Sequence, residues 1–232
     1  MFVISCKYNP NYPYVIQLVD GIRKFHKDEK IVVVDSDSND KSYLDVLKNK
    51  YDVIIEDIVN KNWMVGAYWY AYKKYPNEEF YYFMHDSMIV KDNLDYMKKE
   101  DLTIIMSFSR NIGDYNRWGK RITRDTIYEY KIDGRGCYGP MFFCKNKVMK
   151  KMLDEGIDKI LPENKADTWY SERAYGFFLE EQGYDLDKCS MYGDVLIEEG
   201  AGGRSGPYPH YTEWQFPVEK FYASHVDKNR KF

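Results

Sequence analysis

The stretch "EEFYYFMHDSMIVKDNL", from Glu78 to Leu94, begins as an aromatic, strand-like run and breaks off at His85-Asp86-Ser87 before apolar residues resume. The three polar residues have two interpretations. They form a simple turn, or a buried strand carries them to a sheet edge where they bind a ligand. The pattern of the surrounding chain decides between the two.

The first hundred residues alternate between short apolar runs and segments with apolar residues at helical spacing. The apolar runs are residues 2–6, 31–34, 53–55 and 80–84, and the helical segments are residues 13–25, 40–50 and 63–75, with Asp40 as a plausible N-cap. Short, fully apolar strands separated by helices predict a parallel sheet covered on both faces.

The second half is less regular. Residues 103–107 and the glycine-framed run 136–146 resemble strands, and two helices are expected at residues 147–155 and 171–183, the latter closed by Gly183. Residues 110–124 and 200–209 have loop composition and are the expected lids. We expect one α/β domain over residues 1–232, in which residues 101–232 form a mixed extension of the sheet.

Composition excludes several classes of protein. The chain has 232 residues, enough for a large core, and its 44% apolar and 31% charged residues are typical of a globular protein. A net charge of −3 disfavours a general nucleic-acid binder. No apolar stretch approaches a transmembrane segment, and the N-terminal "MFVISCKYNP" lacks the features of a secretory signal, so a cytoplasmic location is expected.

The four cysteines show no metal-binding spacing. Cys6, Cys137, Cys144 and Cys189 lack a C-x-x-C pair, so reduced thiols are expected, with a zinc site as the alternative.

Polar groups follow each of the four predicted parallel strands. They are Lys7-Tyr8-Asn9, the acidic run 35–40, Glu56-Asp57, and His85-Asp86-Ser87. Ligands bind beyond the carboxyl ends of such strands. The chain has no GxxxxGK[ST] motif and no GxGxxG after the first strand, which disfavours a P-loop enzyme and an NAD dehydrogenase. An acidic, glycine-poor edge suits a nucleotide diphosphate held through a divalent cation.

Three segments together resemble the GT-A glycosyltransferases, in particular the family 2-like nucleotide-diphospho-sugar transferases. They are "VISCKYN" (residues 3–9), "VVVDSDSND" (residues 32–40) and "FYYFMHDSMIVKDNL" (residues 80–94). The resemblance covers most of the chain and is strongest over residues 2–95. It implies a Rossmann-like central sheet flanked by helices, with residues 1–100 as the nucleotide-sugar-binding half and residues 101–232 as the acceptor-binding and catalytic half.

The implied activity is transfer of a sugar from a UDP- or GDP-linked donor to a glycan or other hydroxyl acceptor, with inversion and with help from Mn²⁺ or Mg²⁺. Asp86 matches the carboxylate that holds the metal. His85 stands where the family often has its first acid and Ser87 where some members have the last one, so one carboxylate remains. His225 is a further candidate ligand, or else a solvated histidine near the end of the chain.

The resemblance also assigns the residues around the nucleotide. Asp35 and Asp37 match acids that bond the nucleobase and ribose, although an Asx turn that caps the next helix is the alternative. The residues expected to line the base pocket are Cys6, Tyr8 and Asn9, and those in the segment that closes over a uridine are Asp57, Lys61 and Gly66.

The catalytic base is expected in "TWYSERAYGFFLEEQGYD". Glu172 matches the first acid of the family's pair, and Arg173 replaces the second, so Glu172 is the predicted base with Asp167 as its substitute. Glu172 could instead be a first-turn acid favoured by the helix dipole. Arg173 is expected to bind the diphosphate or to form a salt bridge.

The acceptor is expected to lie on the "GCYGPMFF" strand, with Gly136 and Gly139 allowing close approach and Tyr138 and Trp169 stacking on the sugar. Two other functions stay open. One is a degenerate carbohydrate-binding protein without activity, favoured by the single acid in "HDS". The other is a sugar-phosphate nucleotidyltransferase. Those enzymes usually carry a glycine- and arginine-rich first loop, which "KYNPNYP" in this chain is not.

Overall fold

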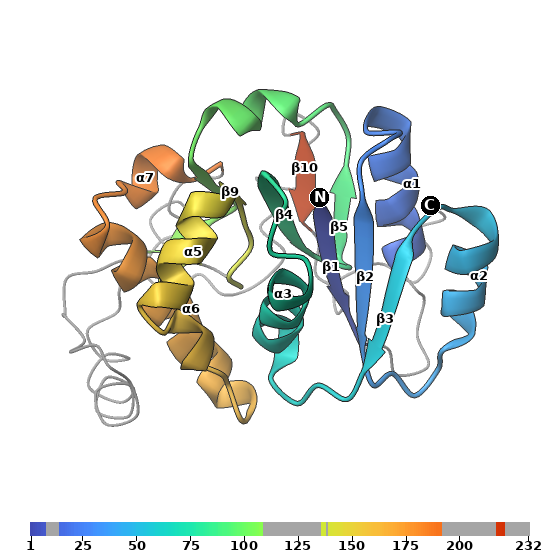
Figure 1. The fold of residues 1–232 in the computed structure, drawn as a ribbon, viewed down its shortest axis with the longest axis horizontal. Coiled ribbons are helices and arrows are strands. Elements are labelled where there is room, and N and C mark those ends of the chain that lie inside the picture. The colour runs from blue at the N-terminus through green and yellow to red at the C-terminus, as the bar shows by residue number, and fades with distance from the viewer. Residues whose placement is uncertain (8–13, 109–135, 138, 192–216, 221–232) are drawn as a thin grey trace.

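The computed structural model describes residues 1–7, 14–108, 136–137, 139–191 and 217–220 (Figure 1). These residues form an α/β fold around a six-stranded sheet in the order β3-β2-β1-β4-β9-β6. Strands β1 to β4 are parallel to one another, whereas β9 runs antiparallel to β4 and to β6. The predicted mostly parallel sheet with a mixed extension is therefore confirmed.

The sheet strands are β1 (Phe2–Cys6), β2 (Ile31–Ser36), β3 (Ile54–Ile58), β4 (Phe80–His85), β6 (Leu102–Ile104) and β9 (Phe142–Lys145). Two small antiparallel pairs join β5 (Met88–Val90) to β10 (Val218–Lys220), and β7 (Ser107–Phe108) to β8 (Gly136–Cys137). The helices are α1 (Val15–Phe25), α2 (Ser42–Lys50), α3 (Trp63–Lys74), α5 (Asn146–Asp154), α6 (Lys165–Glu181) and α7 (Leu186–Cys189), with short 3-10 turns η1 (Asp95–Lys99) and η2 (Ile157–Lys159).

Alternation along the strands divides the core into two layers, because successive side chains of a strand point to opposite faces. On one face Phe2, Ile4, Val33 and Tyr82 pack with α1 and α2. The other face packs with α3, α5 and α6, and its buried side chains include Val3, Val34, Tyr81 and Phe83. Covering both faces explains why the strands read as continuous apolar runs.

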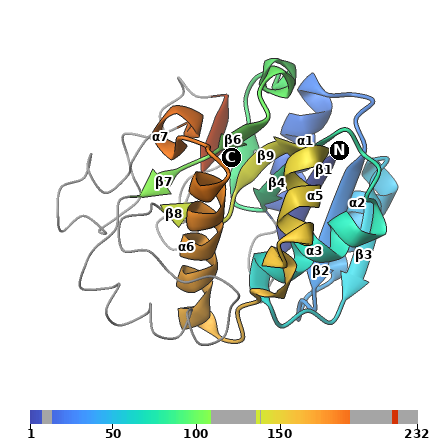
Figure 2. The same ribbon diagram turned by 60° about the vertical axis from the view of Figure 1, so that its left-hand side comes forward.

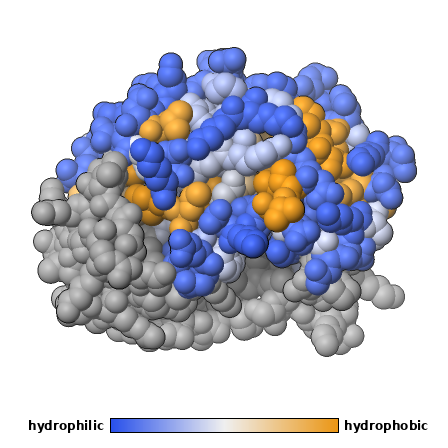
Figure 3. All heavy atoms as spheres, turned by 60° about the horizontal axis from the view of Figure 1, so that its bottom comes forward, coloured by the Kyte–Doolittle hydropathy of each residue, from blue (hydrophilic) through white to orange (hydrophobic). Residues whose placement is uncertain are grey.

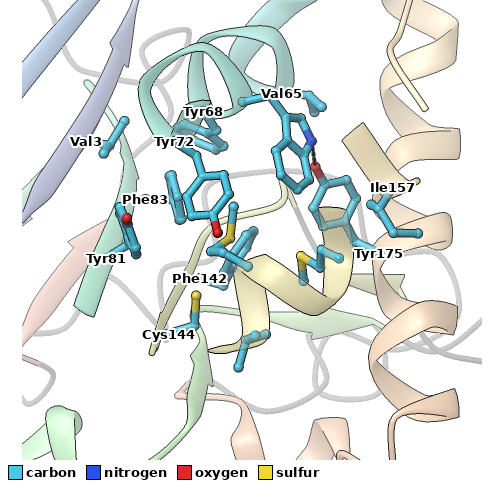
Figure 4. Close-up of a cluster of buried hydrophobic side chains, with 14 of the residues drawn as sticks. Val3, Val65, Tyr68, Tyr72, Tyr81, Phe83, Phe142, Cys144, Ile157 and Tyr175 are labelled. Carbon is cyan, nitrogen blue, oxygen red and sulfur yellow. Dashed lines mark hydrogen bonds between the residues drawn. The ribbon is translucent and has the colours of Figure 1, made fainter. Parts of the chain in front are cut away.

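Aromatic side chains dominate the layer beneath α3 (Figure 4). Tyr72 meets Tyr81 edge to face, and Tyr81 stacks on Phe83. Trp69 of α3 donates a hydrogen bond of 2.6 Å to the hydroxyl of Tyr175 in α6, drawn as a dashed line in Figure 4. This bond ties the first half of the chain to the second, and α6 lies along β8 on the same side (Figure 2).

Three sequence predictions need correction. The helix expected at residues 171–183 begins at Lys165, so Glu172 lies in mid-helix and the first-turn interpretation of this residue is wrong. The strand expected at residues 103–107 is divided between β6 and β7. The N-cap of α2 is Lys41, although Asp40 does accept a 2.9 Å hydrogen bond from the Ser42 amide.

Two further observations concern the whole described chain. Its four cysteines form no disulfide, as expected, and three of them are buried. None of the helices in the described ranges is long and apolar enough to cross a membrane.

Candidate functional site

An open pocket of about 510 Å³ lies where β1, β2 and β4 end. The carboxyl ends of these strands and the N-termini of α3 and α6 lie on the same side, the lower edge in Figure 1, and Figure 3 is turned so that this side comes forward. The residues lining the pocket are Ser5, Cys6, Lys7, Ser36, Asn60, Lys61, Trp63, Met64, His85, Asp86 and Glu163.

The pocket lies on the α3 side of the sheet, and strand alternation determines which side chains reach it. Ser5 pairs in register with His85, and both continue the alternation of the residues that face α3. Ser36 does the same at the end of β2, and the ring of His85 lies 6.4 Å from that of Tyr68 in α3. These positions form the floor of the site.

Asp35 belongs to the opposite face. Its carboxylate is wholly buried, and it accepts a 2.9 Å hydrogen bond from the Ser38 amide and further bonds from the hydroxyls of Ser38 and Tyr43. Asp35 thus orders the turn after β2 but does not cap α2, whose N-cap Lys41 makes no side-chain capping bond, and Asp35 does not line the pocket. The predicted bond from Asp35 to a nucleobase is not tested by the structure. The hydrogen bonds from Ser38 and Tyr43 to the Asp35 carboxylate disfavour it.

The other predicted donor-binding acids also lie away from the pocket wall. Asp57 pairs in register with Asp35 and forms an exposed 2.8 Å ion pair with Lys41, the N-cap residue of α2. Asp37 is exposed in the turn after β2, with a φ of 61° that aspartate tolerates better than most residues. Tyr8 and Asn9 fall outside the described residues.

The predicted metal motif does reach the pocket. His85 and Asp86 both line it, and the Asp86 amide donates a 3.2 Å hydrogen bond to the Ser5 carbonyl. Cys6 also lines the pocket; burial raises the pKa of its thiol well above the usual range, and the nearby charge of Asp86 adds to the effect. Ser87 is half-buried but not in the pocket wall, and His225 lies outside the described residues.

Asn60 organises the connection between β3 and α3. Its side-chain amide donates to the Ser36 hydroxyl at 2.9 Å and to the Trp63 carbonyl at 2.6 Å, and its oxygen accepts from the Asn62 amide at 2.9 Å. A Cβ on Gly66 would lie 2.2 Å from that oxygen, so the glycine is needed for this packing. Lys61 lines the pocket, whereas Gly66 packs closely against the Asn60 side chain.

The candidate base lies beside the candidate metal motif. The Gly139 amide donates a 2.9 Å hydrogen bond to the Glu172 carboxylate. Gly139 has a φ of +61°, and a Cβ there would lie 3.1 Å from Cε1 of His85, so the imidazole packs against this glycine. Three segments far apart in the sequence therefore meet at Gly139.

Glu172 is electrostatically suited to proton transfer. Burial raises the pKa of this carboxyl group to about 7, while the Gly139 amide and the positive charge of Arg173 act in the opposite direction. A carboxyl group with a pKa near neutrality can accept a proton and release it again at physiological pH.

The remaining predicted residues of the second half have mixed placements. Asp167 is buried and accepts hydrogen bonds from the Glu163 amide at 3.1 Å and from Asn164 at 2.8 Å, which orders the first turn of α6. Arg173 is buried and does not line the pocket, and Gly136 is buried in β8. Tyr138 and the side chain of Trp169 are outside the part that the structure describes.

A divalent cation at this pocket would take its protein ligands from His85 and Asp86. Within the described ranges, no three His, Cys, Asp or Glu side chains gather as a complete metal site. Asp86, with His85 beside it, offers one carboxylate and one imidazole in the same wall. That set fits a Mg²⁺ or Mn²⁺ ion that takes its other ligands from a diphosphate and water.

Sequence reasoning missed several lining residues: Ser5, Ser36, Asn60, Trp63, Met64 and Glu163. A signal was present for two of them. Counting alternate residues from Val3 and Val34, which face α3, leads to Ser5 and Ser36 rather than to Asp35. No comparable signal marks the others, because loops and tertiary packing bring them to the pocket.

Comparisons with known proteins give similarity at the level of solved structures. No protein-family model and no curated protein sequence matches the chain. Staphylococcus aureus TarS 1–349 is 14% identical, with a TM-score of 0.44 over 75% of this chain and 54% of that chain. A cytidylyltransferase from Leptospira borgpetersenii is 13% identical, with a TM-score of 0.41 over 78% of this chain and 71% of that chain.

The bifunctional glycosyltransferase WbbM is 17% identical, with a TM-score of 0.37 over 68% of this chain and 33% of that chain. This chain spans about half the length of TarS 1–349. Likenesses at these identities and TM-scores establish neither a family nor an activity.

Proposed function

We propose that this protein transfers a sugar from a nucleotide-diphosphate donor to an acceptor hydroxyl. The proposal is carried by the contacts of Gly139, which bring the candidate metal-binding residues close to the candidate catalytic base. On one side lies the pocket wall with His85 and Asp86, and on the other lies Glu172 with a pKa of about 7.

The pocket suits a nucleoside diphosphate. Lys7 and Lys61 line it and carry the positive charge that phosphate groups attract, while Ser5 and Ser36 offer hydroxyls to the ribose or base. Asp86 and His85 would hold Mn²⁺ or Mg²⁺, which would supply Lewis-acid stabilisation of the departing diphosphate.

His225 remains a candidate additional ligand. β10 ends at Lys220, which pairs with Met88, and Met88 follows shortly after Asp86. β10 therefore ends close to the metal motif, five residues before His225 in the sequence.

Glu172 is the proposed catalytic base. The acceptor oxygen forms a bond to the anomeric carbon of the donor sugar as the bond from that carbon to the diphosphate oxygen breaks. The proton of the acceptor hydroxyl passes to Glu172, and the electron pair leaves with the diphosphate. Direct displacement of this kind inverts the anomeric configuration. The Gly139 hydrogen bond fixes one carboxylate oxygen during the transfer.

Binding is tested with UDP-, GDP- and CDP-sugars, with and without Mn²⁺, by the shift in thermal unfolding temperature. We expect one donor class to stabilise the protein in a metal-dependent manner. Asp86→Ala should abolish the metal-dependent part. Asp28→Asn is the matched control, because Asp28 is exposed in the turn before β2, at the opposite end of the strands. Equal stabilisation of the Asp86→Ala variant and the wild type would refute the metal assignment.

Turnover is tested by release of free nucleoside diphosphate. Glu172→Gln should keep donor binding and lose turnover. Sugar binding without nucleotide binding would indicate a carbohydrate-binding protein without activity. Formation of a nucleotide sugar from a nucleoside triphosphate and a sugar phosphate would indicate a nucleotidyltransferase.

A further inference from the structure

Trp63 occupies a backbone conformation that its residue type disfavours. Its φ of 51° lies in the left-handed region, and among the described residues the only other non-glycine with positive φ is Asp37. For a bulky side chain this conformation is an outlier, because its Cβ crowds the following carbonyl. Such outliers persist where the surrounding structure enforces them, and they concentrate at functional sites.

The structure enforces this conformation through Asn60. The Asn60 amide holds the Trp63 carbonyl at 2.6 Å and the Ser36 hydroxyl at 2.9 Å, so the residue is tied to the end of β2. Gly66 leaves the space that Asn60 needs. A glycine at position 63 would adopt the same φ without strain, so the tryptophan carries a local backbone cost that a glycine would not.

Trp63 is half-buried and is one of the residues that line the pocket together with Asp86. β2 and β4 are separated only by β1, so their ends lie about 10 Å apart at normal strand spacing. A nucleoside diphosphate bound with its phosphates at Asp86 extends along the pocket, and its base then reaches the β2 side, where Trp63 is anchored.

We propose that Trp63 is the stacking platform for the nucleobase of the donor. The inference rests on the proposed function, because it assumes that a nucleoside diphosphate occupies the pocket. A planar aromatic face suits any base, so Trp63 contributes affinity, while hydrogen bonds from other residues select the base. Asn60 is a positioning residue that orients Trp63 from behind.

The test measures binding of UDP, GDP and CDP by calorimetry, with inorganic diphosphate as a probe that lacks a base. Trp63→Gly removes the indole and suits the observed φ, so the backbone is preserved. We expect it to weaken binding of the preferred nucleoside diphosphate by about 5- to 150-fold. Inorganic diphosphate should bind unchanged. Trp63→Phe should retain most of the affinity, and Tyr96→Ala, which removes an exposed aromatic side chain outside the pocket wall, should bind like the wild type.

Each other result would overturn the inference. If Trp63→Gly binds the nucleoside diphosphate as tightly as the wild type, the indole does not stack on the base. If inorganic diphosphate loses affinity by the same factor, Trp63 shapes the pocket instead of contacting the base. In both cases the proposed function stands. If the wild type binds no nucleoside diphosphate, the proposed function and this inference fail together.

Discussion

Replacing Glu172 by glutamine should make the protein more stable at alkaline pH, even though it removes the proposed catalytic base. The wild-type carboxyl group is partly buried, and burial raises its pKa to about 7 from an ordinary value of 4.5. Its ionised form is therefore unfavourable in the folded protein. Glutamine has the same shape, carries no charge, and can still accept the 2.9 Å hydrogen bond from the Gly139 amide.

The sign and size follow from proton linkage. A group whose folded pKa is raised holds its proton longer in the folded state, so its favourable contribution is complete below pH 4.5 and is lost as the pH rises through 7. Each pKa unit corresponds to about 1.4 kcal/mol, so the loss amounts to at most about 3 kcal/mol. For a chain of this size that is a shift of about 6–12 °C in unfolding temperature. Water around the partly exposed side chain reduces both figures.

The assay is thermal unfolding of the wild type and Glu172→Gln between pH 4.5 and pH 8.5. The difference in unfolding temperature should favour the variant increasingly as the pH rises and should level off above pH 7. Glu56→Gln is a control of opposite sign. Although burial of Glu56 acts the other way, hydrogen bonds from Lys74, Tyr75 and Tyr70 lower the pKa of its carboxyl group. That variant should therefore be less stable than the wild type by an amount that grows as the pH rises toward 4.5 and is nearly constant from there to pH 8.5. A difference for Glu172→Gln that does not change with pH would refute the reasoning.

Three further substitutions or modifications test the packing around the site. Gly139→Ala should destabilise the protein by about 1–3 kcal/mol in chemical denaturation, because alanine is strained at a φ of +61° and its Cβ would press on His85. Gly66→Ala should cost about as much and should also weaken donor binding in calorimetry, since its Cβ would displace the Asn60 side chain. Cys6 should react slowly with iodoacetamide at pH 8, as followed by mass spectrometry, although it lines the pocket, because burial raises the pKa of its thiol. Rapid alkylation of the native protein would contradict that explanation.

The arrangement of the sheet could be predicted from the sequence because local patterns determine it. Apolar runs of strand length and helical spacing between them identify β1 to β4 with their intervening helices, and His85-Asp86 is found at the end of β4 as expected. The start of α6 could not be predicted, because residues 165–170 carry no apolar stripe that distinguishes helix from loop.

The predicted site was incomplete for a different reason. The acidity of Asp35 and Asp57 makes both residues candidate donor ligands. The alternation of side chains along the strands instead directs both toward α2 and places Ser5 and Ser36 at the pocket. The contact between Gly139 and His85 depends on packing between distant segments, which no local pattern records.

The central claim is that one pocket holds the donor between Asp86 and Trp63 with Glu172 close to the reacting centre. A crystal structure of the protein with UDP or GDP and Mn²⁺ tests it most directly. The account predicts that the diphosphate and metal lie at Asp86 and that the base lies against the pocket wall formed by the β3–α3 connection. A nucleotide bound elsewhere on the molecule, with this pocket empty, would contradict it.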